Sequence, residues 1–189
     1  IYKADVHEGQ KTGLFYDQRQ NHKFVASLAN GKTVLDVFCH VGGFGLAAIA
    51  AGASKVSFVD SSANALDLVR EGASEMMASS KINIIRGDAF SVLRKLLESD
   101  NSYDIVICDP PAFVTSRKSL NSGLRAYEKM AKLGSSLVRE NGILVLCSCS
   151  QLADLKKFRN ACVRGIGRAG RRAQLIHTGF AAADHPIHL

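Results

Sequence analysis

The sequence predicts an α/β fold with a doubly wound, mostly parallel sheet, and two observations carry this prediction. Five short apolar runs rich in valine and isoleucine alternate with segments of helical pattern. Strands that alternate with helices pair in parallel, because each helix returns the chain to the same end of the sheet. The 189 residues, 47% hydrophobic and 22% charged, suffice for one domain with a sizeable core.

The first half of the chain contains three strand–helix units. Strands are predicted at residues 34–38, 55–60 and 82–85, where β-branched and aromatic residues gather. The helices that follow them have distinct signals: an alanine-rich run at 46–51 that Gly52 ends, a helix capped by Ser61 or Ser62, and a helix with apolar spacing at 90–97.

The second half repeats the alternation with one longer loop. A strand at residues 103–108 runs directly into Asp109-Pro110-Pro111, and a loop is expected at 114–122. The remaining predicted elements are a helix at 126–138, a turn at 140–142, a strand at 143–148, a basic helix within 156–172 and a strand near 173–177.

The sequence predicts that the chain is divided into two parts. Residues 1–30 are predicted to form an N-terminal extension, a hairpin followed by a helix, and residues 31–189 the α/β domain. The alternation of strands and helices ends before a last strand or hairpin that such a domain would be expected to contain. We therefore expect the domain to be truncated at its C-terminus. No apolar run approaches the roughly 20 residues that cross a bilayer, so no membrane association is expected. Five cysteines, mostly within apolar runs, predict reduced thiols in a cytoplasmic protein.

The net charge of +7 favours a polyanionic partner. Residues 156–172 concentrate basic side chains and contain no acidic one. A solvated helix face is the simple alternative, but such faces usually mix both signs, so phosphate contact is favoured. The basic residues of this segment are Lys156, Lys157, Arg159, Arg164, Arg168, Arg171 and Arg172.

Acidic residues recur where the predicted strands end. Asp36 lies in the first strand, ahead of glycines at 42–45, while Asp60, Asp88 and Asp109 end or follow the next three strands. Ligands of open α/β sheets bind at the carboxyl ends of the strands. A pocket lined by carboxylates suits S-adenosylmethionine, which has a sulfonium, an ammonium, two ribose hydroxyls and an adenine amine. The sequence therefore predicts a Rossmann-like S-adenosylmethionine-dependent methyltransferase fold.

The expected roles within this pocket follow from the same chemistry. Asp60 is expected to accept the ribose hydroxyls and Asp88 the adenine amine, while the helix start after Gly45 takes the methionyl carboxylate. A dinucleotide remains an alternative because Gly43–Ala48 matches G-x-G-x-x-A, and the glycines could also simply turn a strand into a helix. Neighbouring residues complete the cofactor-binding candidates, namely Phe38, Gly42, Gly43, Ser61 and Ala89.

A second group of residues predicts catalysis. In Asp109-Pro110-Pro111 the prolines cannot join a strand ladder, so they direct a carboxylate and rigid carbonyls into the cleft, unless they merely end the strand. Cys149, after the fifth strand, is a candidate nucleophile. Carbon 5 of cytosine attacks a sulfonium methyl only after a thiolate has added to carbon 6, which explains the need for a thiol. Cys147-x-Cys149 lacks the spacing and the second pair of a zinc site, so no metal is expected.

Five motifs, in order along the chain, carry a resemblance to a known family. They are the run 11–19, DVFCHVGGFG at 36–45, DPPAF at 109–113, SCS at 148–150 and ADHP at 183–186. Together they resemble the bacterial ribosomal RNA large subunit methyltransferase I family over almost the whole chain. The resemblance implies a Rossmann-like catalytic domain preceded by a PUA domain and a small β-hairpin region, of which this chain keeps only the end.

The resemblance also implies an activity and a set of site residues. It implies 5-methylcytosine formation in 23S ribosomal RNA, with Cys149 as nucleophile and Asp109 orienting the base. Gln18 and Arg19 would bind or frame the cofactor. The substrate-binding candidates are Pro110, Pro111, Phe113, Lys156, Arg159 and His185. The sequence departs from the family's pattern where relatives often carry a lysine (here Ala112) and an aromatic residue (here Cys147).

Other functions stay open at this point. A guanine-directed ribosomal RNA methyltransferase shares several of these motifs and needs no covalent cysteine. A small-molecule methyltransferase and a non-catalytic RNA-binding module are further alternatives, the last requiring a damaged cofactor pocket. The target nucleotide, the base that removes the carbon-5 proton and the oligomeric state are left unassigned, and a homodimer of the full-length protein is left open.

Overall fold

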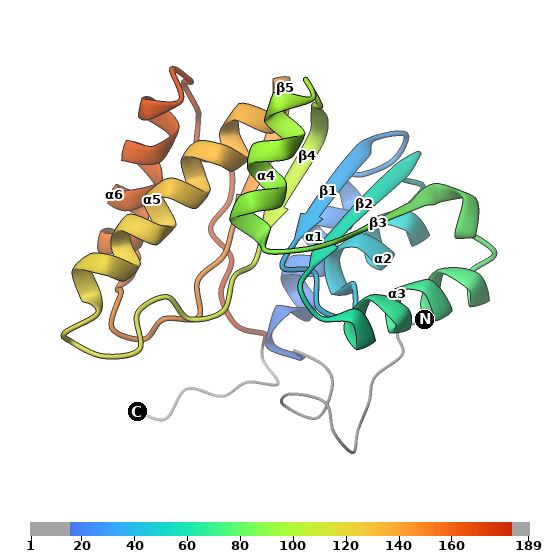
Figure 1. Ribbon diagram of the computed structural model, residues 1–189, viewed down its shortest axis with the longest axis horizontal. Coiled ribbons are helices and arrows are strands. Elements are labelled where there is room, and N and C mark those ends of the chain that lie inside the picture. Colours follow the sequence, from blue (N-terminus) through green and yellow to red (C-terminus); the bar gives the residue numbers. More distant parts are fainter. Residues whose placement is uncertain (1–15, 183–189) are drawn as a thin grey trace.

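Five parallel strands form a single sheet in the computed structural model, which describes residues 16–182 (Figure 1). The strand order is β3-β2-β1-β4-β5, and every neighbouring pair is parallel. The order reverses direction between β1 and β4, so the prediction of a doubly wound α/β sheet is confirmed. The strands are β1 Thr33–Val37, β2 Lys55–Asp60, β3 Ile82–Arg86, β4 Tyr103–Cys108 and β5 Val138–Leu146.

Helices cover both faces of this sheet. Side chains of α1, α2 and α3 pack on one face, and those of α4, α5 and α6 on the other. Ser62, Asp88 and Asp154 cap α3, α4 and α6 by accepting a backbone N–H three residues on. The helices are α1 Arg19–Ser27, α2 Gly43–Ala50, α3 Ala63–Glu75, α4 Ala89–Glu98, α5 Leu120–Leu137 and α6 Leu155–Arg168, with short 3₁₀ turns at Tyr16–Gln18 and Ser79–Lys81.

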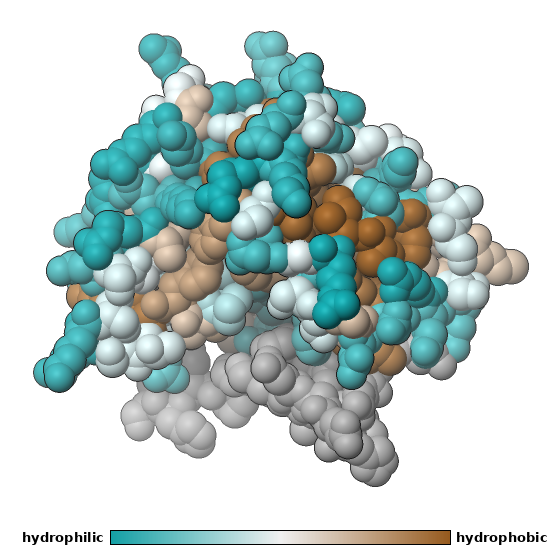
Figure 2. Space-filling model, viewed as in Figure 1, coloured by the Kyte–Doolittle hydropathy of each residue, from teal (hydrophilic) through white to brown (hydrophobic). Residues whose placement is uncertain are grey.

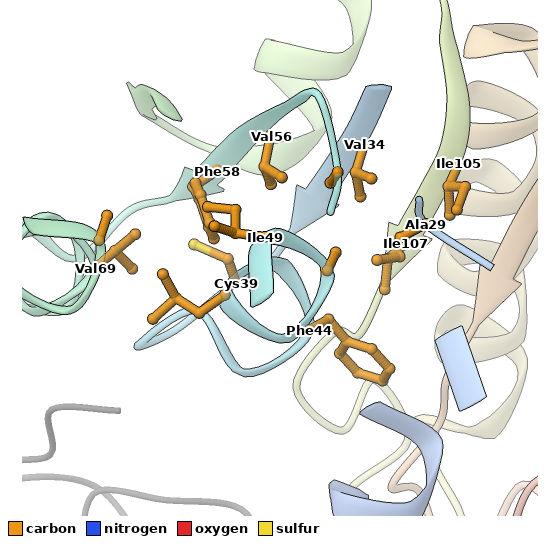
Figure 3. Close-up of a cluster of buried hydrophobic side chains, with 14 of the residues drawn as sticks. Ala29, Val34, Cys39, Phe44, Ile49, Val56, Phe58, Val69, Ile105 and Ile107 are labelled. Carbon is orange, nitrogen blue, oxygen red and sulfur yellow. The ribbon is translucent and has the colours of Figure 1, made fainter. Parts of the chain in front are cut away.

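The two faces have separate hydrophobic cores. Figure 3 shows the first, in which Ile49 of α2 lies against Val56 and Phe58 of β2 while Phe44 lies on the α1 side of α2. The second core surrounds Tyr127 on α5. Strands buried on both faces read as continuous apolar runs, which is why the sequence identified them. The edge strand β3 is only half-buried, and Figure 2 shows hydrophobic residues gathered where β1 to β3 lie.

Two predicted boundaries differ from the structure at α5 and β5. Helix α5 begins at Leu120, not at residue 126, and its first turn contains Gly123. A Cβ at Gly123 would lie 2.5 Å from the Phe113 carbonyl oxygen, so a residue of low helix propensity is required inside this helix. The predicted turn at 140–142 lies within β5, where Asn141 has φ 59° and the pairing with β4 skips from Val138 to Ile143.

The strand predicted near residues 173–177 is wrong. Residues 171–182 contain no strand, and Leu175 and Ile176 are 67% and 68% exposed. A strand needs a neighbour for its ladder, and this run has none in the described part of the chain. Helix α1 lies within the predicted N-terminal extension and contributes Val25 to the first core. The hairpin of that extension lies outside the described residues, and the domain division at residue 30 stays a prediction.

Three basic residues of the segment 156–172 bind α5 or β5 within the protein. Arg164 and Arg168 of α6 both pair with the buried Glu128 of α5. Arg171 donates to the carbonyls of Val138, at 2.8 Å, and Arg139, at 3.2 Å. Arg164, Arg168 and Arg171 thus have partners within the protein. Fewer side chains of residues 156–172 can therefore contact phosphate than the sequence predicts. Within residues 16–182, no helix is both long and apolar enough to cross a membrane.

Replacement of Gly165 by alanine is expected to destabilise the packing of α6 on α5. The new Cβ would lie 2.2 Å from the Glu128 carbonyl oxygen and 2.9 Å from the Ala131 Cβ, so the helices must separate. We expect a loss of about 1–3 kcal/mol in the free energy of unfolding, measured in urea. Gly167→Ala on the same helix is the control, because its Cβ would meet no atom within 4 Å. It should stabilise by about 0.5–1 kcal/mol, and equal stability of the two variants would contradict the prediction.

Candidate active site

A cleft of about 1410 Å³ opens at the carboxyl ends of β1, β2 and β4. Most of the predicted site residues line it, although they come from six separate segments of the chain. Gly42 and Phe113 lie behind its wall, Lys156 and Arg159 lie on α6, and His185 is outside the described residues. The predicted residues on the cleft wall are Gln18, Arg19, Asp36, Phe38, Gly43, Asp60, Ser61, Asp88, Ala89, Asp109, Pro110, Pro111 and Cys149.

Asp36 is a buried carboxyl group at the end of β1. Its Oδ2 accepts the Gly45 N–H at 2.8 Å, while its Oδ1 is buried with no partner among the described residues. Burial raises the pKa of Asp36 to about 8, and the charges of Asp109 and Asp60 add to this effect. A buried carboxylate oxygen that lacks a partner at a cleft wall fits a cationic ligand group, such as the ammonium of S-adenosylmethionine.

Asp60 is held rigidly at the end of β2. Its Oδ2 accepts the His40 N–H and its Oδ1 the Ser62 N–H, both at 2.9 Å. Each carboxylate oxygen has a second lone pair, so the group can still accept hydroxyl donors from the cleft. This arrangement fits the predicted ribose contact, which stays a prediction.

Asp88 caps helix α4, a structural role that was not predicted from the sequence. Its Oδ1 accepts both the N–H and the hydroxyl of Ser91, at 2.9 and 2.8 Å, and thereby caps α4. These hydrogen bonds hold the pKa of Asp88 below its usual value. Asp88 also lines the cleft, beside Ala89, the first residue of α4. Its adenine contact stays a prediction.

The loop between β1 and α2 has an uncommon backbone. Phe38, His40 and Gly42 have positive φ angles of 61°, 49° and 84°. Helix α2 begins at Gly43, and the Gly45 N–H is used by Asp36. The helix therefore starts three residues earlier than predicted, and the Gly45 N–H already has an acceptor. The contact of this helix start with the methionyl carboxylate stays a prediction.

The candidate catalytic residues meet at the junction of β4 and β5. Asp109 follows β4, where its N–H donates to the Val37 carbonyl at 3.2 Å and its Oδ1 lies 3.4 Å from Gln18 Nε2. The Cys149 thiol, beyond the end of β5, lies 3.9 Å from the Pro110 carbonyl oxygen. Gln18, Asp109 and Cys149 are thus brought together from positions far apart in the sequence.

The five cysteines differ sharply in their surroundings. Cys149 is exposed and lines the cleft. Burial raises the pKa of Cys162 to about 12, and it raises the pKa values of Cys39, Cys108 and Cys147 well above the usual range. Those four thiols stay protonated at neutral pH, and protonated thiols are poor nucleophiles. In residues 16–182, no group of three or more His, Cys, Asp or Glu side chains could hold a metal ion.

His22 is a cleft residue that was missed from the sequence, and Phe113 is a predicted site residue that lies outside the cleft. His22 of α1 lines the cleft beneath Gly43, and burial lowers its pKa to about 4, so it is neutral at pH 7. Phe113 does not line the cleft; its ring packs 4.8 Å from that of Tyr127 in the second core. Helical periodicity places His22 on a helix but gives no sign of a cleft, because the pocket forms only when α1 meets α2.

The fold and this carboxylate-lined cleft define an S-adenosylmethionine-dependent methyltransferase. Residues 1–155 match the sequence profile of the family described as S-adenosylmethionine-dependent methyltransferase. The chain belongs to that family. The predicted cofactor is therefore confirmed, and when bound it supplies an electrophilic methyl group on a sulfonium. Asp36 and Asp60 are the residues that would hold its charged and hydroxyl groups.

Curated relatives and solved structures agree with this assignment. The chain is 37% identical over 185 residues to ribosomal RNA large subunit methyltransferase I of Aeromonas hydrophila, covering 97% of this chain and 47% of the relative. The corresponding protein of Shewanella denitrificans is 35% identical over the same shares. The chain thus spans about half the length of the curated relatives that it matches.

Among solved structures, a protein described as a methyltransferase, SMU.776, complexed with SAH, has a TM-score of 0.85 at 24% identity, over 96% of this chain and 48% of that one. This likeness shows the fold. A protein from Streptococcus mutans described as SAM-dependent methyltransferase has a TM-score of 0.76 at 27% identity, over 85% of this chain and 42% of that one. Both support the Rossmann-like methyltransferase fold predicted from the sequence.

Proposed function

We propose that the protein methylates carbon 5 of a cytosine in 23S ribosomal RNA through a transient covalent bond to Cys149. The observation that carries this proposal is the placement of Cys149, the one exposed cysteine of five, on the same cleft wall as Asp36, Asp60 and Asp109. A methyltransferase that acts on nitrogen or oxygen has no need of a thiol there. The names of the curated relatives support ribosomal RNA as the substrate.

The chemistry assigns a step to each residue. The Cys149 thiolate adds to carbon 6, and the electron pair of the 5,6 double bond becomes available at carbon 5. Carbon 5 then attacks the methyl group of the cofactor. Transfer of the carbon-5 proton to water restores the double bond as the bond between sulfur and carbon 6 breaks, which returns the thiolate. Asp109, held by Gln18, orients the base by hydrogen bonding its ring nitrogen or amine.

The substrate side of the cleft is formed by the segment after β4. Pro110 and Pro111 line it as a rigid wall whose backbone cannot join the sheet. Lys156 and Arg159, on the first turns of α6, are exposed and are proposed to contact RNA phosphates. Phe113 supports this wall from behind through its contact with Tyr127.

The identity of the methylated nucleoside tests the proposed function. Unmodified 23S ribosomal RNA is incubated with the protein and methyl-labelled S-adenosylmethionine, digested to nucleosides and separated by chromatography. We expect the label in 5-methylcytidine. Label in a methylated guanosine would overturn the proposal in favour of the guanine-directed alternative, and labelling of small molecules without RNA would favour the small-molecule alternative. RNA already carrying 5-methylcytidine at every cytosine is the control and should accept no label.

A further inference from the structure

A buried tyrosine hydroxyl on α5 contacts both neighbours of Cys149. Tyr127 is 0% exposed, and its hydroxyl lies 2.8 Å from Ser148 Oγ and 2.8 Å from Ser150 Oγ. The two serines therefore anchor the loop that carries Cys149, on both sides of it, to one atom of α5. The hydrogen bond from the Ser150 N–H to Ser148 Oγ, at 3.3 Å, closes the group.

The same group reaches the segment that follows Asp109. Ser150 Oγ accepts the Val114 N–H at 3.1 Å, and Val114 and Ser150 are 3% and 6% exposed. The Tyr127 ring also packs against Phe113 of that segment and, at 5.0 Å, against Phe158 of α6. The phenol thus connects the loop that carries Asp109 and Pro110 with the loop that carries Cys149.

The hydrogen bonds of Tyr127, Ser148 and Ser150 lie beyond the end of β5, where pairing with β4 no longer determines the position of the backbone. Strand β5 ends at Leu146, and the Cys147 N–H to Cys108 carbonyl bond, at 2.9 Å, is the last rung beside β4 that holds this segment. The hydroxyl accepts from Ser148 and shares a second hydrogen bond with Ser150, in which either oxygen can be the donor. Phenylalanine can do neither. Because the group is buried, water cannot readily replace a lost partner.

We propose that Tyr127 is a positioning residue, which holds the Cys149 thiol beside the Pro110 carbonyl and at attacking distance from a base oriented by Asp109. This inference rests on the proposed function, in which Cys149 is the nucleophile. Tyr127 itself does not line the cleft and touches neither substrate nor cofactor. Its effect comes from the geometry of the nucleophile, to which covalent catalysis is steeply sensitive.

The test compares Tyr127→Phe with Tyr103→Phe, the same change at a buried tyrosine at the start of β4, the strand end away from the cleft. Three quantities are measured: the Kd for S-adenosylmethionine, kcat and KM for methyl transfer to RNA, and the rate of covalent capture of RNA containing 5-fluorocytosine. Fluorine cannot leave carbon 5 as a cation, so the methylated adduct persists. Tyr127→Phe should lower kcat and the capture rate together by about 10–100-fold, with Kd and KM changed less than about twofold. Tyr103→Phe should change none of them.

The outcomes separate the inference from the function on which it rests. Wild-type protein that captures no RNA overturns the proposed function, and the role of Tyr127 falls with it. Capture by the wild type at a rate equal to that of Tyr127→Phe overturns the inference alone, as does a loss that appears only in KM or in cofactor affinity. If Tyr127→Phe does not fold, Ser148→Ala removes one of the same bonds at a half-buried side chain. Ser148→Ala should then slow covalent capture of the RNA without changing the Kd for S-adenosylmethionine. A capture rate equal to that of the wild type would refute the inference.

Discussion

Replacing Cys149 with alanine should abolish methyl transfer to RNA while leaving cofactor binding intact. The carbanion equivalent at carbon 5 cannot form without the thiolate, so we expect kcat to fall by about four to six orders of magnitude, as when other covalent nucleophiles are removed. The side chain is exposed and follows the end of β5, so the midpoint of thermal unfolding should not change. The measurement combines methyl-transfer kinetics, capture of 5-fluorocytosine RNA and S-adenosylmethionine titration.

Cys162→Ala is the matched control for this change. Cys162 is buried in α6, and burial raises its pKa to about 12, so the thiol takes no part in nucleophilic chemistry. Below its unfolding temperature the variant should retain methyl transfer and capture RNA at the wild-type rate. Activity that survives in Cys149→Ala would contradict the covalent mechanism and would favour direct transfer to a nitrogen atom.

Asp36→Asn should weaken cofactor binding about 10–100-fold, the value of one charge-assisted hydrogen bond. Asparagine keeps an oxygen for the Gly45 N–H, so the loop is retained while the negative charge is lost. Because the pKa of Asp36 is about 8 in the cofactor-free protein, binding of a cation must displace a proton at pH 7. Wild-type affinity should therefore rise between pH 6 and pH 8, and affinity of the variant should not.

The same group sets a pH dependence of stability, and its sign is fixed by the raised pKa. Between the unfolded value of 3.8 and the folded value of about 8, the folded protein binds one proton more than the unfolded chain. The contribution of Asp36 is thus fully present below pH 4 and is lost as the pH rises to 8, by roughly 1.4 kcal/mol per pH unit at most. Asp36→Asn should remove this slope and be more stable than the wild type at pH 8.

Titration calorimetry and urea unfolding at pH 6, 7 and 8 measure both effects of Asp36→Asn. Asp100→Asn is the control, because Asp100 is exposed after α4 with φ 53°, a conformation that asparagine adopts readily. It should match the wild type in both measurements. Equal cofactor affinity of wild type and Asp36→Asn at pH 8 would show that the carboxylate does not contact the cation.

The fold was predictable from the sequence because the central strands β1, β2 and β4 are buried on both faces. Val34, Val56 and Ile105 belong to apolar runs whose lengths match single strands, and glycine or serine marks the helix that follows. The strand near residues 173–177 was mispredicted by the same reasoning. An apolar run shows that a strand can form, but not that a neighbouring strand is present to pair with it.

Apart from Gln18 and Arg19, which came from the family resemblance, the cleft residues were predictable where chemistry coincides with strand ends. Asp36, Asp60 and Asp109 were found because the carboxyl ends of parallel strands share one edge. Tyr127 was not found, since its partner Ser150 lies 23 positions away and helical periodicity identifies it only as part of a buried face. Such contacts depend on how α5 lies across the sheet, which no local pattern records.

The loop at residues 38–42 has a consequence for the energetics of ligand association. Phe38 and His40 occupy left-handed conformations, which cost side-chain-bearing residues on the order of 1–3 kcal/mol each. The His40 N–H to Asp60 bond and the Gly42 N–H to Cys39 carbonyl bond hold the loop in this shape through contacts within the protein. The protein therefore bears the cost of preorganisation during folding, and a ligand entering the cleft loses little affinity to ordering this loop.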